Sequence, residues 1–265
     1  MKRTLIIVQG LLMAYTAFFI VSLIYTFFTG IFILITGLQE VNSQIDYCLM
    51  VMAVMTACLL FYLWYKKYMG HVEAAVDFRK IFSLKHIDIY LMIALGCQFF
   101  VSGILSLIRP LFANLFANYE ETISSIFVAD TVIVAVYVII LAPIIEELIL
   151  RGILFNRLRY GLSFYSANLI QALVFGIYHW NIIQGLYAFG IGLILGYVYE
   201  KTRSLYVPIL LHVFINGLGF LIRIFNFGTY ISIWAAILIG AIFLFAGIFL
   251  FARNLGDLNN KQKDK

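Results

Sequence analysis

Two adjacent glutamates, Glu146 and Glu147, stand near the end of an apolar run and precede Arg151. Glu147 and Arg151 are four residues apart with the acid first, which is the favourable order for an ion pair along one helix. Glu146 lies about 100° around that helix and cannot share this contact equally. We therefore predict that Glu147 and Arg151 form a structural pair, whereas Glu146 faces a cavity and serves general acid or base catalysis. Pro143 lacks a backbone N–H and can kink the helix beside the carboxylates.

Two histidines follow on later apolar segments, each with other residues at helical spacing. Gln171, Phe175 and His179 recur at every fourth position and fall on one stripe of a helix. His212 and Asn216 are also four residues apart, so they share one face of another helix. Buried histidine and asparagine side chains need hydrogen-bond partners, and two on one face favour a polar pocket. Taken singly, each segment is also compatible with ordinary helix packing or a membrane interface.

The joint pattern is more informative than its parts, because ionisable residues inside apolar spans are costly and usually mark function. One glutamate, two histidines and one asparagine can together activate a water molecule and stabilise an oxyanion. Three of these side chains could instead bind a divalent metal such as zinc, which supplies similar chemistry. The sequence contains neither HExxH nor GxSxG nor a P-loop. The candidate catalytic residues are Glu146, His179, His212 and Asn216, and the candidate metal ligands are Glu146, His179 and His212.

These residues belong to a chain that is 64% hydrophobic and only 12% charged. Soluble domains contain about 25% charged residues. Apolar runs of about 20 residues recur along the sequence, as transmembrane helices require, and they are too long for barrel strands. We predict an all-α, polytopic membrane protein with about eight transmembrane helices. The candidate spans are residues 5–35, 48–65, 88–108, 126–150, 163–181, 183–200, 205–222 and 230–251.

The distribution of basic residues supports this number of spans. With the N-terminus inside, 16 of the 18 lysines and arginines fall in cytosolic segments, or 15 if Arg151 lies within the membrane, and the exceptions are Arg109 and Arg223. The positive-inside rule then places both termini in the cytosol. We predict a multi-pass protein of the cell membrane. The net charge of +5 reflects this asymmetry, so we expect membrane lipids as neighbours and no nucleic-acid partner.

This arrangement of spans raises a problem of depth for the candidate side chains. If the fifth span starts at Leu162, His179 lies about 25 Å along it. Glu146 and His212 lie only about 12–16 Å from the cytosolic ends of their spans. The three side chains converge only if residues 161–167 run along the interface and the fifth helix starts later, or if that helix tilts strongly. We expect the later start.

The chain divides into three predicted parts. Residues 1–108 form accessory transmembrane helices, and residues 126–222 form a catalytic core of four transmembrane helices. Residues 223–265 supply the last transmembrane helix and a cytosolic tail. The mixed-charge segment 66–86 forms either an amphipathic helix on the cytosolic face or a solvated loop, and the sequence does not decide between them.

Three short motifs resemble, in order and approximate spacing, those of the CPBP family, which is also called the Abi family. This family comprises CAAX proteases and bacteriocin-processing enzymes. The motifs are Glu146-Glu147-x-x-x-Arg151, Phe175-x-x-x-His179 and His212-x-x-x-Asn216.

The resemblance implies a CAAX-protease-like helical core with a conical cavity that is open to lipid and reached from the cytosolic side. It implies that Glu146 and His179 activate the attacking water, and that His212 and Asn216 stabilise the oxyanion. Glu147, Arg151 and Phe175 would then be supporting residues. Family members are described both as metalloproteases and as glutamate-dependent enzymes, so the resemblance leaves the metal open.

Two functions of different classes follow. The first is an intramembrane endopeptidase that hydrolyses a peptide bond of a hydrophobic or lipidated peptide or protein, as in CAAX processing or in peptide and bacteriocin maturation. The second is a non-catalytic immunity or regulatory protein that binds a membrane partner such as a sensor kinase. A proton-coupled transporter is less favoured, because the sequence shows no inverted repeat.

Overall fold

The computed structural model describes residues 2–38, 40–68, 81–127, 129, 131–225 and 231–259. These residues are almost entirely helical and include no strand, which confirms the predicted all-α class. The long helices are α1 (Lys2–Thr36), α2 (Ser43–Tyr68), α4 (Leu84–Ile108), α10 (Ile182–Thr202), α11 (Tyr206–Ile224) and α12 (Ile233–Asn259). Of the mixed-charge segment 66–86, residues 69–80 lie outside the described residues, so the choice between helix and loop stays open there.

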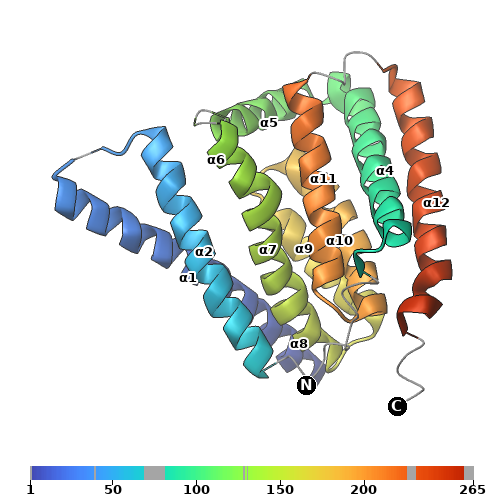
Figure 1. Ribbon diagram of the computed structural model, residues 1–265, viewed down its shortest axis with the longest axis horizontal. Coiled ribbons are helices and arrows are strands. Elements are labelled where there is room, and N and C mark those ends of the chain that lie inside the picture. Colours follow the sequence, from blue (N-terminus) through green and yellow to red (C-terminus); the bar gives the residue numbers. More distant parts are fainter. Residues whose placement is uncertain are drawn as a thin grey trace.

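A long composite helix runs through the middle of the molecule (Figure 1). It includes two π-helical segments, which are frequent at functional sites. Pro143 stands in the first turn of its central part. The wide turn just before Pro143 accommodates the missing N–H, so the helix continues instead of breaking. In chain order the composite helix consists of α6 (Thr131–Ala135), η3 (Val136–Leu141), α7 (Ala142–Glu147), η4 (Leu148–Phe155) and α8 (Asn156–Arg159).

Within the described ranges, 7 helices are long and apolar enough to cross a bilayer. The fifth predicted span, residues 163–181, corresponds to the shorter helix α9 (Phe164–Tyr178) of 15 residues, which is not among these 7. At 1.5 Å per residue α9 is about 22 Å long, which is less than the bilayer core of about 30 Å. A 3₁₀ turn, η2 (Arg109–Leu111), and the helix α5 (Ala113–Ile126) were not predicted, and α5 lies across one end of the bundle (Figure 1).

The prediction that the fifth helix starts after residue 167 is wrong, because α9 begins at Phe164. The length of the composite helix, and not a later start of α9, brings Glu146 to the depth of His179. It continues past the predicted end at residue 150 to Arg159, about 20 Å beyond Glu146. His179 lies about 22 Å beyond Phe164, so it reaches a similar depth. The predicted span ended at residue 150 because the next residue, Arg151, is charged. A charged residue usually marks the end of a transmembrane helix unless a buried partner neutralises it.

The helices on either side of the composite helix are arranged in two pairs (Figure 1). α1 and α2 form a hairpin on one side, and α4 packs along α12 on the other. The second pair is very close, because a Cβ atom on Gly240 would lie 2.2 Å from the backbone N of Phe100. Small residues allow such contacts between membrane helices. The predicted accessory residues 1–108 therefore lie on both sides of the predicted core.

Candidate active site

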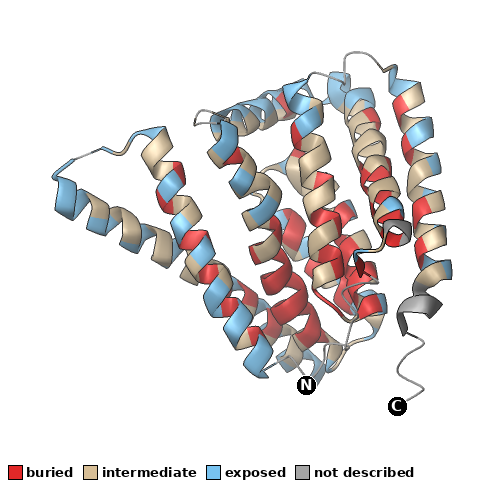
Figure 2. Cartoon of the chain, in the orientation of Figure 1, coloured by how far each residue is buried: buried red, intermediate tan, exposed pale blue. Residues whose placement is uncertain are grey.

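Buried residues concentrate around the end of the composite helix that carries Glu146, Glu147 and Arg151 (Figure 2). The predicted pair forms: Arg151 Nη1 lies 2.7 Å from Glu147 Oε1, and both side chains are 0% exposed. Arg151 Nη2 also donates to the carbonyl of Gly192 on α10, at 3.0 Å. Buried charges are tolerated when they are paired and their remaining hydrogen-bonding groups are satisfied. These contacts stabilise the guanidinium inside the bundle, while Arg151 Nε and Glu147 Oε2 are buried without a hydrogen-bond partner among the described residues.

His212 on α11 joins the same carboxylate. Its Nδ1 lies 2.9 Å from Glu147 Oε1, while its Nε2 lies 3.7 Å from Glu146 Oε2. A carboxylate bonded to Arg151 is an acceptor, so His212 Nδ1 carries the hydrogen of this bond. In the neutral imidazole the lone pair is then on Nε2, the nitrogen that faces Glu146.

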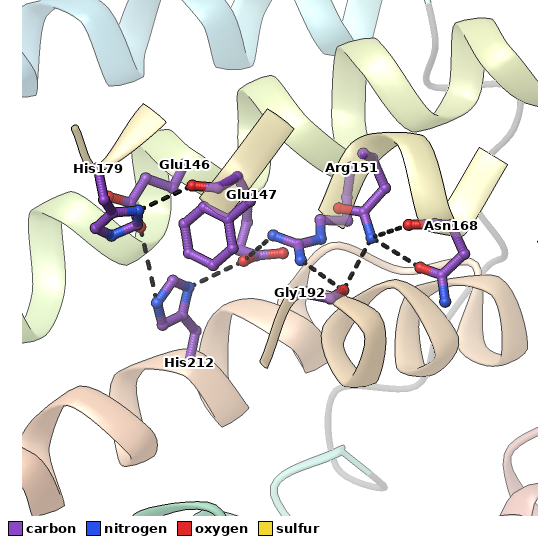
Figure 3. Close-up of polar contacts among 9 residues, drawn as sticks. Glu146, Glu147, Arg151, Asn168, His179, Gly192 and His212 are labelled. Atoms are coloured by element: carbon purple, nitrogen blue, oxygen red, sulfur yellow. Dashed lines mark hydrogen bonds and ion pairs between the residues drawn. The ribbon is translucent and has the colours of Figure 1, made fainter. Parts of the chain in front are cut away.

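His179 forms the C-terminal cap of α9, and its ring is held by its own helix. His179 Nδ1 lies 2.9 Å from the carbonyl oxygen of Phe175. A carbonyl can only accept, so the hydrogen is again on Nδ1 and the lone pair on Nε2. The ring is near enough to Glu146 for an electrostatic interaction, and Figure 3 shows Glu146, His179 and His212 gathered at one end of the cluster. The structure therefore brings together three of the four predicted catalytic residues.

Phe175 packs at the centre of this cluster. Its ring centroid lies 4.9 Å from that of His179 and 5.7 Å from that of His212, both in edge-on geometry. The guanidinium of Arg151 lies 5.3 Å from the same ring. A buried aromatic ring with these contacts restricts the orientation of both imidazoles and of the arginine.

The structure does not bring Asn216 to the other predicted catalytic residues. Asn216 Nδ2 donates to the carbonyl of Val138 in η3 at 2.9 Å, and so joins α11 to the composite helix. His212 and Asn216 thus do not form one polar pocket as predicted. His212 bonds to Glu147, and Asn216 bonds to Val138 one helical turn further on. The second N–H of the Asn216 amide is not used by this bond.

Sequence reasoning missed several residues around the site. Asn168 and Gly192 gave no signal, although both belong to the buried polar network (Figure 3). Gln171 was placed on the correct stripe of α9 but without a partner. Three tyrosines from three different segments also lie close enough to interact electrostatically with Glu146; they are Tyr137, Tyr178 and Tyr187.

The candidate metal ligands do not fit a metal site as they are arranged. In the described part of the chain, no three histidine, cysteine, aspartate or glutamate side chains are grouped closely enough to hold a metal ion. Glu147 is already bonded to an arginine and a histidine. The arrangement can nevertheless do acid and base chemistry, because His212 Nε2 lies 3.7 Å from a Glu146 carboxylate oxygen and His179 is near enough to interact with Glu146 electrostatically.

The part of the chain that carries this site is similar in sequence to known membrane peptidases. Residues 128–218 match the sequence model of the family described as "Type II CAAX prenyl endopeptidase Rce1-like". The chain is 31% identical over 108 residues to YdiL of Bacillus subtilis, which is named as a membrane peptidase. It is 28% identical over 96 residues to the membrane-embedded CAAX protease MroQ of Staphylococcus aureus.

These matches cover only part of each protein. The match with YdiL covers 40% of this chain and 44% of the relative, and the match with MroQ covers 34% and 39%. The chain thus spans less than half the length of these two curated relatives. No solved structure matches the chain.

Proposed function

We propose that this chain is an intramembrane endopeptidase, because residues 128–218 match the sequence model of a family of CAAX prenyl endopeptidases. It hydrolyses a peptide bond of a hydrophobic or lipidated peptide or protein with a water activated by Glu146 and His179. The observation that carries this proposal is how the rings of the two histidines are held. Each ring is bonded through Nδ1, so its Nε2 is the nitrogen left for water or substrate, and His212 Nε2 lies 3.7 Å from Glu146 Oε2.

In this mechanism the attacking water donates one hydrogen bond to the Glu146 carboxylate and one to His179 Nε2. Glu146 takes the proton as the water oxygen bonds to the carbonyl carbon of the substrate. The same proton then passes to the leaving nitrogen as the C–N bond breaks. A positioned base of this kind typically contributes about 10²–10⁴-fold to the rate.

His212 stabilises the oxyanion when its Nε2 is protonated. The imidazolium that results is stabilised by Glu147, which accepts the bond from His212 Nδ1 at 2.9 Å. Asn216, which donates to the carbonyl of Val138, has a supporting part in this mechanism, because it holds α11 against the composite helix one turn after His212. Preorganised donors in a buried site are effective because they need no reorganisation during the reaction. No step in this mechanism passes through a metal ion.

An apolar groove supports a hydrophobic substrate. It has a volume of about 360 Å³ and lies between α2, the composite helix and the start of α11. Ile144 and Leu148 line it, and they flank the Glu146–Glu147 pair on the composite helix. A hydrocarbon chain or an apolar side chain bound there would be within one or two helical turns of the candidate catalytic residues. The other lining residues are Cys58, Leu59, Tyr62, Tyr65, Leu205, Tyr206 and Ile209.

The orientation is part of the proposal. α1 begins and α12 ends at the same end of the molecule (Figure 1), which agrees with two termini on one side of the membrane. The charge distribution of the sequence favours the cytosolic side for both.

The direct test is cleavage of fluorogenic peptides by the purified protein in detergent, with one farnesylated peptide and one unmodified apolar peptide. Glu146→Gln and His179→Ala should each reduce kcat by about 100-fold or more. Glu200→Gln is a matched control, because Glu200 is paired with Arg159 and Arg203 outside the site. Cleavage that persists in both site variants would exclude the proposal.

The second candidate is the non-catalytic membrane protein. It is favoured by the role of Glu147, Arg151 and His212 in joining three helices, since such a network stabilises the bundle even without hydrolysis. This candidate predicts that Glu146→Gln leaves the cellular phenotype of the protein intact. Loss of that phenotype in Glu146→Gln, with normal protein levels, would favour the peptidase.

A further inference from the structure

Two buried amides lie on α9 before His179, and the proposed mechanism does not use them. Gln171 is 0% exposed, and its Nε2 lies 2.7 Å from Asn168 Oδ1 and 2.8 Å from the carbonyl oxygen of Gly192. Asn168 Nδ2 donates to the carbonyl of Leu193 at 3.0 Å. The amide pair therefore fastens α9 to two consecutive carbonyls of α10.

The carbonyl of Gly192 is also the acceptor for Arg151 Nη2, at 3.0 Å. One backbone oxygen of α10 thus receives donors from α9 and from the composite helix (Figure 3). From Arg151 the polar contacts continue to Glu147 and then to His212. The amide pair is consequently the far end of a continuous hydrogen-bonded chain that reaches the candidate catalytic residues.

The small residues of α10 leave room for the amide pair. A Cβ atom on Gly196 would lie 1.9 Å from Asn168 Oδ1 and 2.6 Å from Gln171 Nε2. A Cβ atom on Gly192 would lie 3.1 Å from the Cα atom of Ala172. The two glycines, one helical turn apart, therefore form a notch that the amide side chains fill.

We propose that Gln171 is a positioning residue for the hydrolytic reaction, which presupposes the function proposed above. By bonding to the Gly192 carbonyl that also binds Arg151, Gln171 sets the position of α9 along the composite helix. His179 lies two turns further along the same stripe of α9, with Phe175 between them. A shift of α9 by one residue would move His179 by about 1.5 Å relative to Glu146.

The size of the effect follows from the geometry of water activation. A displacement of about 1 Å between reacting groups can reduce a rate by about 100-fold. Gln171→Met keeps the length of the side chain and removes the donor. We expect kcat to fall by about 10–100-fold, while KM changes by less than about threefold, because the apolar groove is not altered.

Asn156→Leu is the matched control. Asn156 is also a buried amide, but it donates to Gly152 and to Tyr199, outside the chain of contacts that leads to His212. This variant should lose stability and keep its kcat. Gly196→Ala should lower kcat like Gln171→Met, and the double variant should be no worse than the more severe single one, since both changes act on the same amide contact. Fully additive losses in kcat would contradict the proposal.

A spectroscopic measurement separates this proposal from the proposed function. Protein labelled with ¹⁵N-histidine in detergent should show changed ring signals for His179 in Gln171→Met and unchanged ones in Asn156→Leu. If the wild-type protein hydrolyses no peptide, the proposed function fails and these signals alone decide the positional role. If Gln171→Met does not fold, Asn168→Ala replaces it, because it removes the acceptor that orients Gln171. Folded variants with wild-type kcat and wild-type His179 signals would overturn the proposal.

Discussion

The substitution Arg151→Met tests the buried charge cluster most directly. Arg151 makes two hydrogen bonds and packs on Phe175, and neither it nor Glu147 has exposed surface. Without the guanidinium, the Glu147 carboxylate remains buried with His212 as its hydrogen-bond partner. Removal of one member of a buried ion pair costs about 3–5 kcal/mol. That cost lowers the folding equilibrium constant by more than about 100-fold.

The double variant Glu147→Gln/Arg151→Met should recover most of this loss. A buried pair can often be replaced by neutral groups of similar volume at little cost, and glutamine retains an oxygen for the His212 Nδ1–H. We expect its stability to lie within about 2 kcal/mol of the wild type. Its kcat should nevertheless fall, because a neutral amide cannot stabilise the His212 imidazolium.

The measurement is reversible unfolding in mixed micelles with increasing dodecyl sulfate, followed by tryptophan fluorescence. Arg203→Met is the control, since Arg203 is partly exposed and its pair with Glu200 should contribute less than about 1 kcal/mol. An Arg151→Met protein within about 1 kcal/mol of the wild type would refute the reasoning. So would a double variant that is less stable than Arg151→Met alone.

Three other predictions use different measurements. Ile144→Trp should fill the apolar groove and raise KM for apolar peptides several-fold with little change in kcat. Peptide kinetics would measure both constants, and an unchanged KM would show that the substrate does not bind in the groove. Because the donor atoms do not form a metal set, dialysis against a strong chelator should leave the rate unchanged, and a loss that added zinc restores would contradict this. In a cysteine-free background, an impermeant maleimide should label Glu120→Cys but not Arg3→Cys in intact cells, and the opposite result would invert the proposed topology.

The spacing of residues in the sequence predicted the contacts that form within a single helix. The Glu147–Arg151 pair and the stripe of Gln171, Phe175 and His179 are local features, so a spacing of four residues was sufficient to find them. The all-α class and most spans followed from the length of the apolar runs. Helix ends were less accurate, because the end near residue 150 depended on whether Arg151 was neutralised.

Contacts between segments distant in the chain could not be predicted in the same way. The bond from Asn216 to Val138 depends on how α11 packs against η3. The shared carbonyl of Gly192 depends on the crossing of three helices, and a backbone oxygen has no sequence signature. The roles of the candidate catalytic residues rest on chemistry and on family resemblance, so they remain predictions until the variants are assayed.

The shortness of α9 has a consequence for the lipid around the protein. Its end at Tyr178 is followed by His179, then by Trp180 in a left-handed conformation and by Asn181, which bonds to Thr122 of α5 at 3.5 Å. A helix of about 22 Å leaves the polar turn at its end below the level that a full-length span would reach. Such a turn must be hydrated or be matched by a thinner bilayer. If the chain hydrolyses peptides as proposed, the supply of water to the reaction, and with it the rate, should depend on the acyl chain length of the lipid.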